Sequence, residues 1–383
     1  MVRGFQANKL KTRLLPKKDL SKGYQKLEAM MMSLVADSLS HEGSYVWGNI
    51  FAPCEILQCF DKRTLSIECL SCYFSGYHLE DYFIDCAQNA GLAPTLCSYH
   101  KTFAGAVESG VLKAPEYAVT TSLSCDGNLN TFRYLEKKIG VPFTFLDVPY
   151  DCDPESVDYL ADQLREMTKS LEKEHYYPGE IISQLYLMMG THLLMGTEEF
   201  RNLVNFMVKD IQTYPRFEGK RILWVHLLPF YQETLRSYFN GSRRYQVIAS
   251  DIVLDYANEL DASDPFRALA VKTIRNIYNG SYAYKAEALG QFAREVDADA
   301  VIHFCHWGCK QASGGSVLLK EKMKEMGIPM LILDGDGIDK RNSHDGQIKT
   351  RLEAFLEILD EEDGEESDAG RKNRIDGKKE KAC

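Results

Sequence analysis

The chain has 383 residues, of which 45% are apolar and 26% charged, a composition typical of globular proteins rather than of disordered or fibrous ones. This length exceeds what one hydrophobic core usually supports, so we expect two α/β domains of about 130 to 180 residues each. The net charge of -10 is spread along the chain without a basic face, which argues against nucleic acid as a partner.

The sequence gives no sign of export or of membrane insertion. The basic N-terminal stretch MVRGFQANKLKTRLLPKKDL lacks the apolar segment of a secretory signal, and no run reaches the about 18 to 20 apolar residues that cross a bilayer. We therefore expect a cytoplasmic protein. In a reducing compartment its eleven cysteines should be thiols or metal ligands rather than disulfides.

The first 150 residues predict a helical arm followed by an α/β domain. Residues 1–45 form a basic arm with a helix from Tyr24 to Ser38. Residues 46–150 form domain one, in which short apolar runs such as AGLAPTLCSY, YAVTTSLSC and PFTFLDVPY alternate with helix-like stretches. This alternation is the rhythm of βαβ units, so we expect a flavodoxin-like or Rossmann-like parallel sheet.

A helical bridge is predicted for residues 151–218. Asp153 is a suitable N-cap, Pro154 suits the first helical position, and the helical pattern runs to about Glu174. A second long helix follows Gly179 and carries a stripe of Ile, Leu and Met at helical spacing. Long helices should therefore join the two domains.

Domain two is predicted for residues 219–360. Its four apolar runs, RILWVHLLPF, YQVIASDIV, DAVIHFCHW and PMLILDGD, are separated by helical patterns such as PFRALAVKTIRNIY and SVLLKEKMKEM. Ligands gather at the carboxyl ends of parallel strands, so we expect site residues in the loops after HFCHW and LILDGD. Residues 361–383 turn acidic and then basic and predict a disordered tail that includes Cys383.

Five cysteines lie near predicted strand ends or the starts of loops, where polar or glycine-containing turns follow them. They are Cys54, Cys97, Cys125, Cys305 and Cys309. A single cysteine in such a place is explained equally well as a thiol that packs in the core and binds no metal, but five together indicate metal ligands. Iron-sulfur clusters need thiolates sheltered from water, and loops at a domain interface supply them. We predict a cluster for electron transfer between the two domains.

Zinc is the alternative metal. Cys69 and Cys72 form one close pair and Cys305 and Cys309 another, with histidines near the second pair. The two pairs are separated by about 230 residues and a domain boundary, which is unusual for the paired loops of a structural zinc site. Cys69 and Cys72 also fit two positions of a buried core helix.

Five segments, in this order, carry a resemblance to a known family: PCEIL at Pro53–Leu57, LCSYHK at Leu96–Lys101, SCDGN at Ser124–Asn128, HWGCKQ at His306–Gln311, and LDGDGIDKRN followed by GQIKTRLEAF. Over roughly residues 45–360 the chain resembles the D-component family of 2-hydroxyacyl-CoA dehydratases, which includes subunits of 2-hydroxyglutaryl-CoA dehydratase and of benzoyl-CoA reductase.

The resemblance implies a fold, a cofactor and partners. It implies flavodoxin-like domains that flank a 4Fe-4S cluster, which receives single electrons from a separate ATP-hydrolysing iron-sulfur activator. It also implies an oxygen-sensitive lyase that works with a homologous subunit or as a homodimer. One-electron reduction of a 2-hydroxyacyl-CoA thioester to a ketyl radical would let water leave. Related proteins with a double-cubane cluster reduce small molecules, and a non-catalytic electron relay is a further alternative.

The resemblance also implies which cysteines of this chain bind the cluster, when each ligand position of the family is matched to this sequence in turn. Cys97 and Cys309 match the ligand positions, and Cys54 is the choice for the third ligand. Many relatives place the first cysteine a few residues before the P-x-E segment, so Cys54 would be a shifted ligand. Cys125 and Cys305 are additional candidate metal ligands, and they would serve a double-cubane arrangement.

Two polar residues next to these cysteines are candidates for catalysis. Glu55 and His100 could transfer protons or form hydrogen bonds to the cluster sulfurs. Ordinary capping or surface roles are the alternative for both residues.

Overall fold

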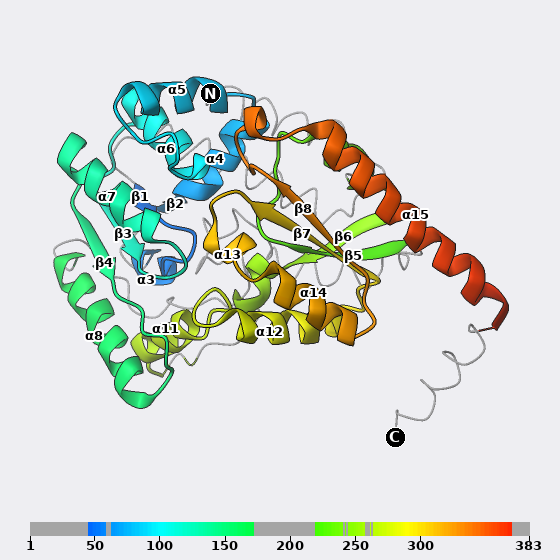
Figure 1. Ribbon diagram of the computed structural model, residues 1–383. Helices are drawn as coiled ribbons and strands as arrows, with labels where there is room; N and C mark the ends of the chain where they lie inside the picture. The colour runs from blue at the N-terminus through cyan, green and yellow to red at the C-terminus, as the bar shows by residue number, and fades with distance from the viewer. Residues whose placement is uncertain are drawn as a thin grey trace, which may run out of the picture.

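The computed structural model describes residues 45–58, 63–171, 219–239, 242, 244–256, 261 and 263–369. The expected N-terminal helix and the second bridging helix lie outside these residues, as do Cys59 and Cys383. Figure 1 shows two α/β halves, each built around a sheet, with the short helix α13 between them.

The first half contains four strands and six helices in the described residues. In chain order they are β1 (Tyr45–Gly48), α3 (Cys54–Gln58), β2 (Arg63–Ser66), α4 (Ile67–Gly76), α5 (Glu80–Asn89), α6 (Ser98–Glu108), β3 (Tyr117–Thr121), α7 (Asp126–Ile139), β4 (Phe143–Leu146) and α8 (Pro154–Leu171). All strand pairs are parallel, and the strand order is β2-β1-β3-β4.

The second half contains four more strands. Its elements are β5 (Lys220–Val225), α10 (Glu233–Phe239), β6 (Tyr245–Ser250), the 3-10 helix η2 (Asp251–Tyr256), α11 (Pro265–Ile274), α12 (Tyr282–Glu295), β7 (Ala300–His306), α13 (Lys310–Ser313), α14 (Ser316–Glu325), β8 (Met330–Gly335), the 3-10 helix η3 (Lys340–Asn342) and α15 (Asp345–Ala369). The strand order is β6-β5-β7-β8, again all parallel.

The two sheets therefore have the same topology. In each half the chain runs from the first strand to a neighbour on one side and then crosses to the other side. The crossing creates a switch point between β1 and β3 in the first sheet and between β5 and β7 in the second. Parallel α/β sheets bind ligands outside the carboxyl ends of the strands at such points. The prediction of two parallel α/β sheets is confirmed.

The halves share one apolar core. A single cluster of buried side chains includes Val46 and Val119 of the first sheet and Leu223 and Val301 of the second. Two further clusters fill the opposite face of each sheet. Helix α8 packs against α11 across the boundary, and these two helices lie side by side in Figure 1. Because the core is continuous, the strand ends of the two sheets are held at fixed positions relative to each other.

Local sequence signals explain many element boundaries. Ser156 donates its backbone N–H to Asp153 Oδ1 at 2.8 Å, so Asp153 caps helix α8 as the sequence predicts. The four apolar runs of the second half contain strands β5, β6, β7 and β8. The first-half runs YAVTTSLSC and PFTFLDVPY contain β3 and β4.

Two segments differ from the expectation. The run AGLAPTLCSY contains no strand; it forms the turn between α5 and α6 and the first residues of α6. Gly91 has a φ of 96°, which breaks the extended backbone that a strand needs. At the other end of the chain, helix α15 continues to Ala369, beyond the position where the charged tail was expected to begin.

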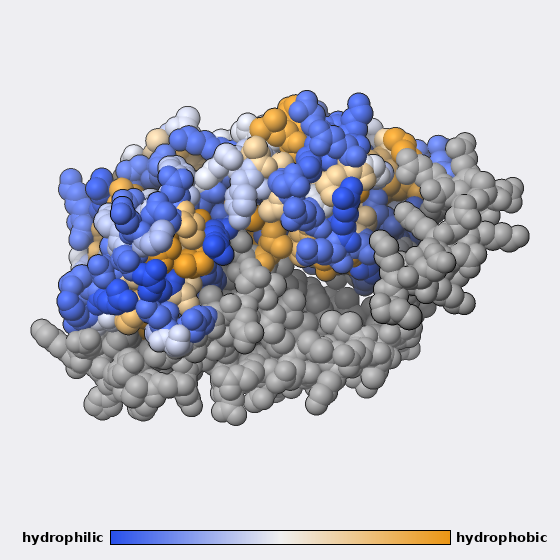
Figure 2. Space-filling view, turned by 90° about the horizontal axis from the view of Figure 1, so that it is seen from below, coloured by the Kyte–Doolittle hydropathy of each residue, from blue (hydrophilic) through white to orange (hydrophobic). Residues whose placement is uncertain are grey.

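On the face of the molecule that Figure 2 shows, much of the coloured surface is hydrophilic. In the view of Figure 2, apolar residues appear in separate groups rather than in one band. No helix among the described residues is long and apolar enough to cross a membrane.

Candidate metal centre

Three cysteines stand at the start of helices where the two sheets meet. Cys97 is the N-cap residue of α6, Cys125 that of α7 after β3, and Cys309 that of α13 after β7. The first helical turn has backbone N–H groups without partners in the helix. Some of these N–H groups point at the sulfurs: burial raises the pKa of Cys97 and of Cys125, and the N–H groups of Tyr99 and Gly127, respectively, oppose that rise. Backbone donors therefore stabilise negative charge on the thiols.

The three thiols lie close enough for their charges to interact. Burial raises the pKa of Cys97 most, and the neighbouring Cys125 and Cys309 thiols raise it further. Burial also raises the pKa of Cys125 to about 11, again with a contribution from Cys309. Two of these residues come from the first half and one from the second, so the group exists only in the folded chain.

Each thiol has its own imidazole neighbour. Cys97 Sγ lies 3.3 Å from His306 Nε2, Cys309 Sγ lies 3.7 Å from His226 Nε2, and Cys125 Sγ lies 3.8 Å from His100 Nε2. The rings of His226 and His306 are almost parallel, with centroids 6.2 Å apart. The three sulfurs are thus surrounded by nitrogen groups that can donate hydrogen bonds.

Burial keeps these imidazoles neutral. It lowers the pKa of His100 to about 4, with a smaller contribution from His306. It also lowers the pKa of His306, although the nearby Asp336 carboxylate acts in the opposite direction. At neutral pH each neutral ring has one N–H to donate.

A buried lysine lies behind Cys309. Lys285 Nζ is 3.5 Å from Asp251 Oδ2 and 3.7 Å from the centre of the Tyr278 ring. Burial raises the pKa of Cys309, and this rise is opposed by the backbone N–H groups of Ala312 and Gln311 and, less strongly, by the charge of Lys285. The site therefore contains a positive charge that offsets part of the charge of a thiolate group.

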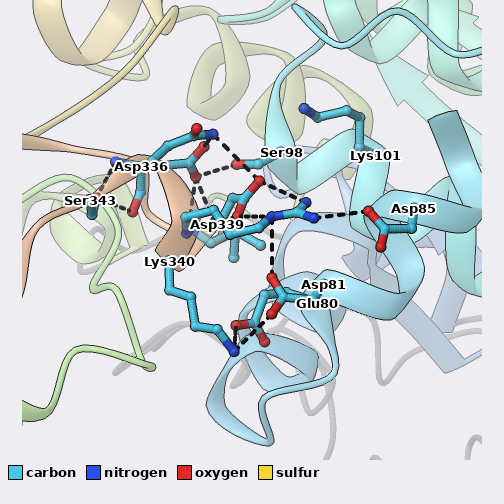
Figure 3. Close-up of polar contacts among 12 residues, drawn as sticks. Glu80, Asp81, Asp85, Ser98, Lys101, Asp336, Asp339, Lys340 and Ser343 are labelled. Carbon is cyan, nitrogen blue, oxygen red and sulfur yellow. Dashed lines mark hydrogen bonds and ion pairs between the residues drawn. The ribbon is translucent and has the colours of Figure 1, made fainter.

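The loop after β8 connects this site to the first half. Ser98, next to Cys97, donates its hydroxyl to Asp336 Oδ1 at 2.5 Å, and the backbone N–H groups of Ile338 and Asp339 donate to the same oxygen at 2.9 Å. Figure 3 shows Ser98 and Asp336 pointing toward each other from the two halves. The aspartates of the DGDGIDKRN segment thus organise the loop and its contact with α6.

The structure places Cys54 and Glu55 at helix α3. Cys54 is the first residue of this helix, but its side chain lies outside the described part of the chain. Glu55 is fully buried and forms an ion pair with Lys272 of α11 in the other half. Glu55 thus contributes a contact between the two halves, and its role in proton transfer stays a prediction.

Three other cysteines are buried within regular elements, and one of them, Cys305, is still close enough to Cys309 for their charges to interact. Cys305 is buried in β7, and its Sγ contacts the backbone oxygen of Ala312 at 3.4 Å. Cys69 and Cys72 are buried in helix α4, in the apolar core, as the core-helix interpretation predicted. The zinc alternative joins Cys69 and Cys72 with Cys305 and Cys309. The first pair lies in helix α4, whereas the second lies in β7 and at the start of α13, so the two pairs have different surroundings.

The donor set fits an iron-sulfur cluster. Among the described residues, no group of three His, Cys, Asp or Glu side chains is arranged to hold a single metal ion. A cluster needs ligands that are further apart than those of a single ion, because each thiolate binds a different iron and the sulfurs must surround a larger group. Three partly buried thiols at three helix starts, with N–H donors around them, meet the needs of such a cluster.

The contacts that two histidines of this site, His226 and His306, make with the cysteine sulfurs were not predicted from the sequence. His226 directly follows the apolar strand β5 at the switch point, and His306 is the last residue of β7. The available signal was a polar residue at the end of a buried strand in a parallel sheet. His226 also has a φ of 76°, a backbone conformation that residues other than glycine rarely adopt and that often marks functional sites.

Comparisons with known proteins show which family the chain belongs to. Residues 49–176 and 175–359 match the family described as 2-hydroxyglutaryl-CoA dehydratase, D-component. The (R)-2-hydroxyisocaproyl-CoA dehydratase alpha subunit of Clostridioides difficile is 20% identical over 380 residues, which cover 82% of this chain and 90% of that protein. The (R)-phenyllactyl-CoA dehydratase alpha subunit of Clostridium sporogenes is 20% identical over 330 residues, covering 71% of this chain and 79% of that protein.

A shorter similarity reaches one of the subunits of benzoyl-CoA reductase from Thauera aromatica, which is 26% identical over 102 residues that cover 26% of this chain and 24% of that protein. The family match extends over nearly all of both α/β halves. This chain belongs to the 2-hydroxyglutaryl-CoA dehydratase D-component family.

Proposed function

We propose that the chain binds a 4Fe-4S cluster through Cys97, Cys125 and Cys309 and acts as a subunit of a 2-hydroxyacyl-CoA dehydratase-type lyase. The observation that carries the proposal is the meeting of these three thiols, from both halves, at the carboxyl ends of the strands. The names of two relatives support the substrate class, since both are alpha subunits of 2-hydroxyacyl-CoA dehydratases.

The cluster, when bound, would supply single electrons at low potential. The chain's own residues would shelter it, because the imidazoles of His226 and His306 are buried and Cys97 is partly buried. Backbone N–H groups at the helix starts and the charge of Lys285 would stabilise the thiolates. His100, beside Cys125, would donate a hydrogen bond to that sulfur.

The number of protein ligands bears on the chemistry. Three thiolates leave one iron of a four-iron cluster without a protein ligand, an arrangement suited to catalysis at the metal. A fourth thiolate from Cys54, at the start of α3, would favour electron transfer alone. Whether Cys54 adds a fourth ligand to these three therefore bears on whether the cluster would catalyse a reaction or only transfer electrons.

Partners follow from the family membership. We propose that a separate ATP-hydrolysing iron-sulfur activator supplies the electrons and that a homologous subunit, or a second copy of this chain, completes the enzyme. The relatives are themselves named as subunits of enzymes, which supports an enzyme of more than one polypeptide here.

Iron and sulfide analysis with electron paramagnetic resonance, done under anaerobic conditions, tests the cluster. We expect about four irons and four sulfides per chain, against about eight irons for a double-cubane cluster. Cys97→Ser, Cys125→Ser and Cys309→Ser should each lose most of the iron. Cys152→Ser is the matched control, since this exposed thiol lies outside the group. Full iron retention in Cys125→Ser and loss in Cys54→Ser would exclude our ligand set.

Turnover separates the lyase from its alternatives. The chain, with a paralogous subunit and an activator, is given a 2-hydroxyacyl-CoA and ATP, and the unsaturated product is sought by mass spectrometry. Product formation that depends on activator and ATP supports the lyase. Four irons without turnover would favour the relay function, and about eight irons would favour the double-cubane reductase.

A further inference from the structure

The side chain of His306 is held on all sides. It is 1% exposed, and the Tyr99 ring stands edge-on to it, with ring centroids 5.1 Å apart. The parallel ring of His226 lies on another side, with centroids 6.2 Å apart. Rotation of the imidazole would require Tyr99 or His226 to move, so its two nitrogens keep distinct neighbours.

One of these neighbours fixes the position of the ring proton. The backbone N–H of Gly337 donates to His306 Nδ1 at 2.9 Å. A backbone N–H can only donate, and a ring nitrogen that accepts a hydrogen bond carries no proton. The proton of His306 must therefore be on Nε2. This conclusion follows from hydrogen bonding alone.

Gly337 is itself confined to its place. A Cβ atom at this residue would lie 2.4 Å from the Tyr99 hydroxyl oxygen, so a side chain would push the loop away from α6. Asp336 and its contact with Ser98 hold the same loop. The donor to Nδ1 is thus part of a rigid contact between the two halves.

The acceptor that faces the Nε2 proton is the sulfur of Cys97, with Nε2 and Sγ 3.3 Å apart. The other two imidazoles differ. His100 Nδ1 faces the hydroxyl of Thr131, which can donate or accept, and its Nε2 is 3.8 Å from Cys125 Sγ. His226 Nδ1 is buried without a hydrogen-bond partner among the described residues. Of the three rings, His306 is the one whose tautomer a backbone donor fixes.

We propose that His306 is a positioning residue that donates its Nε2 proton to the Cys97 sulfur and thereby raises the reduction potential of the group that Cys97 binds. The inference rests on the proposed function for the identity of that group. A hydrogen bond to a ligating sulfur stabilises the reduced state, which carries one more negative charge. The Gly337 N–H would set the tautomer, so the loop after β8 would control the potential from the second half.

Two substitutions separate the roles of the two nitrogens. His306→Asn keeps an acceptor near the Nδ1 position for Gly337 but loses the donor at Nε2. His306→Gln keeps an N–H near the Nε2 position for Cys97 but loses the acceptor. His303→Asn is the control, because His303 is also a buried imidazole of β7 and contacts Cys305 rather than Cys97.

The midpoint potential of the cluster is measured by anaerobic titration with paramagnetic resonance detection. His306→Asn should favour the oxidised state by roughly tenfold, which is a shift of about 59 mV to more negative potential for one electron. His306→Gln and His303→Asn should stay close to the wild type. Equal shifts in His306→Asn and His306→Gln would indicate a packing effect and would overturn the proposal, as would no shift in His306→Asn.

A second measurement needs no cluster. Nitrogen NMR of histidine-labelled, metal-free chain should show His306 protonated at Nε2 and unprotonated at Nδ1, and Cys97→Ala should change the Nε2 signal. A proton on Nδ1 would overturn the inference even in a protein that binds a full cluster. Absence of iron from the wild-type protein would instead refute the proposed function and the effect on potential, whatever tautomer the NMR shows.

Discussion

Glu68 is a carboxyl group in helix α4 that is buried near the thiols and is held by neutral hydrogen-bond donors. The backbone N–H of Ile50 donates to its Oε2 at 2.9 Å, and the Ser66 hydroxyl donates to the same oxygen at 3.0 Å. Burial raises its pKa from 4.5 to about 7, and these hydrogen bonds only partly oppose the rise. Its negative charge also raises the pKa of Cys125. At this residue, protonation is linked to folding.

The link predicts how stability depends on pH. Between pH 4.5 and about 7 the folded chain keeps a proton on Glu68 that the unfolded chain has released, so the free energy of unfolding falls as pH rises through this window. The complete loss is about 3 kcal/mol. Glu68→Gln stays neutral and can accept the same hydrogen bonds. Urea unfolding at pH 4.5 and pH 8 should show a smaller pH dependence for Glu68→Gln by about this amount; an equal dependence would contradict the assignment.

At the scale of elements, helix α6 carries much of the site. It begins after Cys97, contains His100 one turn later, and packs against both α4 and α5. The contact with α5 is so close that a Cβ atom at Gly105 would lie 1.7 Å from the backbone oxygen of Phe83. The glycine is needed for this approach, and the position of Cys97 depends on it.

Gly105→Ala should therefore destabilise the protein by roughly 3 kcal/mol or more, because the clash is with backbone and one helix must move. Gly346→Ala in α15 is the matched control, since a Cβ atom there meets nothing within 4 Å. It should raise stability by about 0.5 to 1 kcal/mol through the higher helix preference of alanine. Thermal unfolding followed by circular dichroism measures both. Equal effects of the two substitutions would show that α5 and α6 do not approach this closely.

At the scale of the whole molecule, contacts between the two halves hold them in a fixed relative position. Beside the shared core, the loop after β8 forms ion pairs with helix α5. Arg341 binds Asp339 with two hydrogen bonds of 2.9 and 3.0 Å and reaches Asp85 at 2.8 Å and Asp81 at 3.3 Å. Figure 3 shows Asp81 and Asp85 of α5 close to Asp339 of the loop, in the same contact between the halves.

Arg341→Ala should lower stability by about 1 kcal/mol, because the buried Asp339 loses the guanidinium but keeps its hydrogen bonds from the backbone N–H of residue 341 and from Asn342, and the other contacts are partly screened by water. Lys310→Ala is the control. Lys310 also bridges the halves, to Asp126 at 3.2 Å, but this pair is fully accessible to solvent and its removal should have no measurable effect. Denaturant unfolding of both variants measures the difference. A loss of equal size in both would show that the ion pairs around Arg341 do not hold the halves.

The strands of the second half and the helix cap at Asp153 could be predicted from the sequence, because a run of apolar residues or a capping side chain acts within a few positions. Cys97 and Cys309 were also identified as candidate ligands from their places at the starts of loops, and the structure brings them together. The segment AGLAPTLCSY shows where prediction from the sequence fails, since its apolar residues suit the buried start of a helix as well as a strand.

By itself, the sequence determined two parallel α/β halves, their family, and the strand ends where a site should lie. Only the tertiary structure decided that Cys125 lies beside Cys97, that Glu55 pairs with Lys272, and that His306 faces the Cys97 sulfur. The physical reason is how far apart in the sequence the interacting residues lie. Secondary structure and caps depend on neighbouring residues, whereas these contacts join positions more than two dozen residues apart, which meet only when the two sheets share one core.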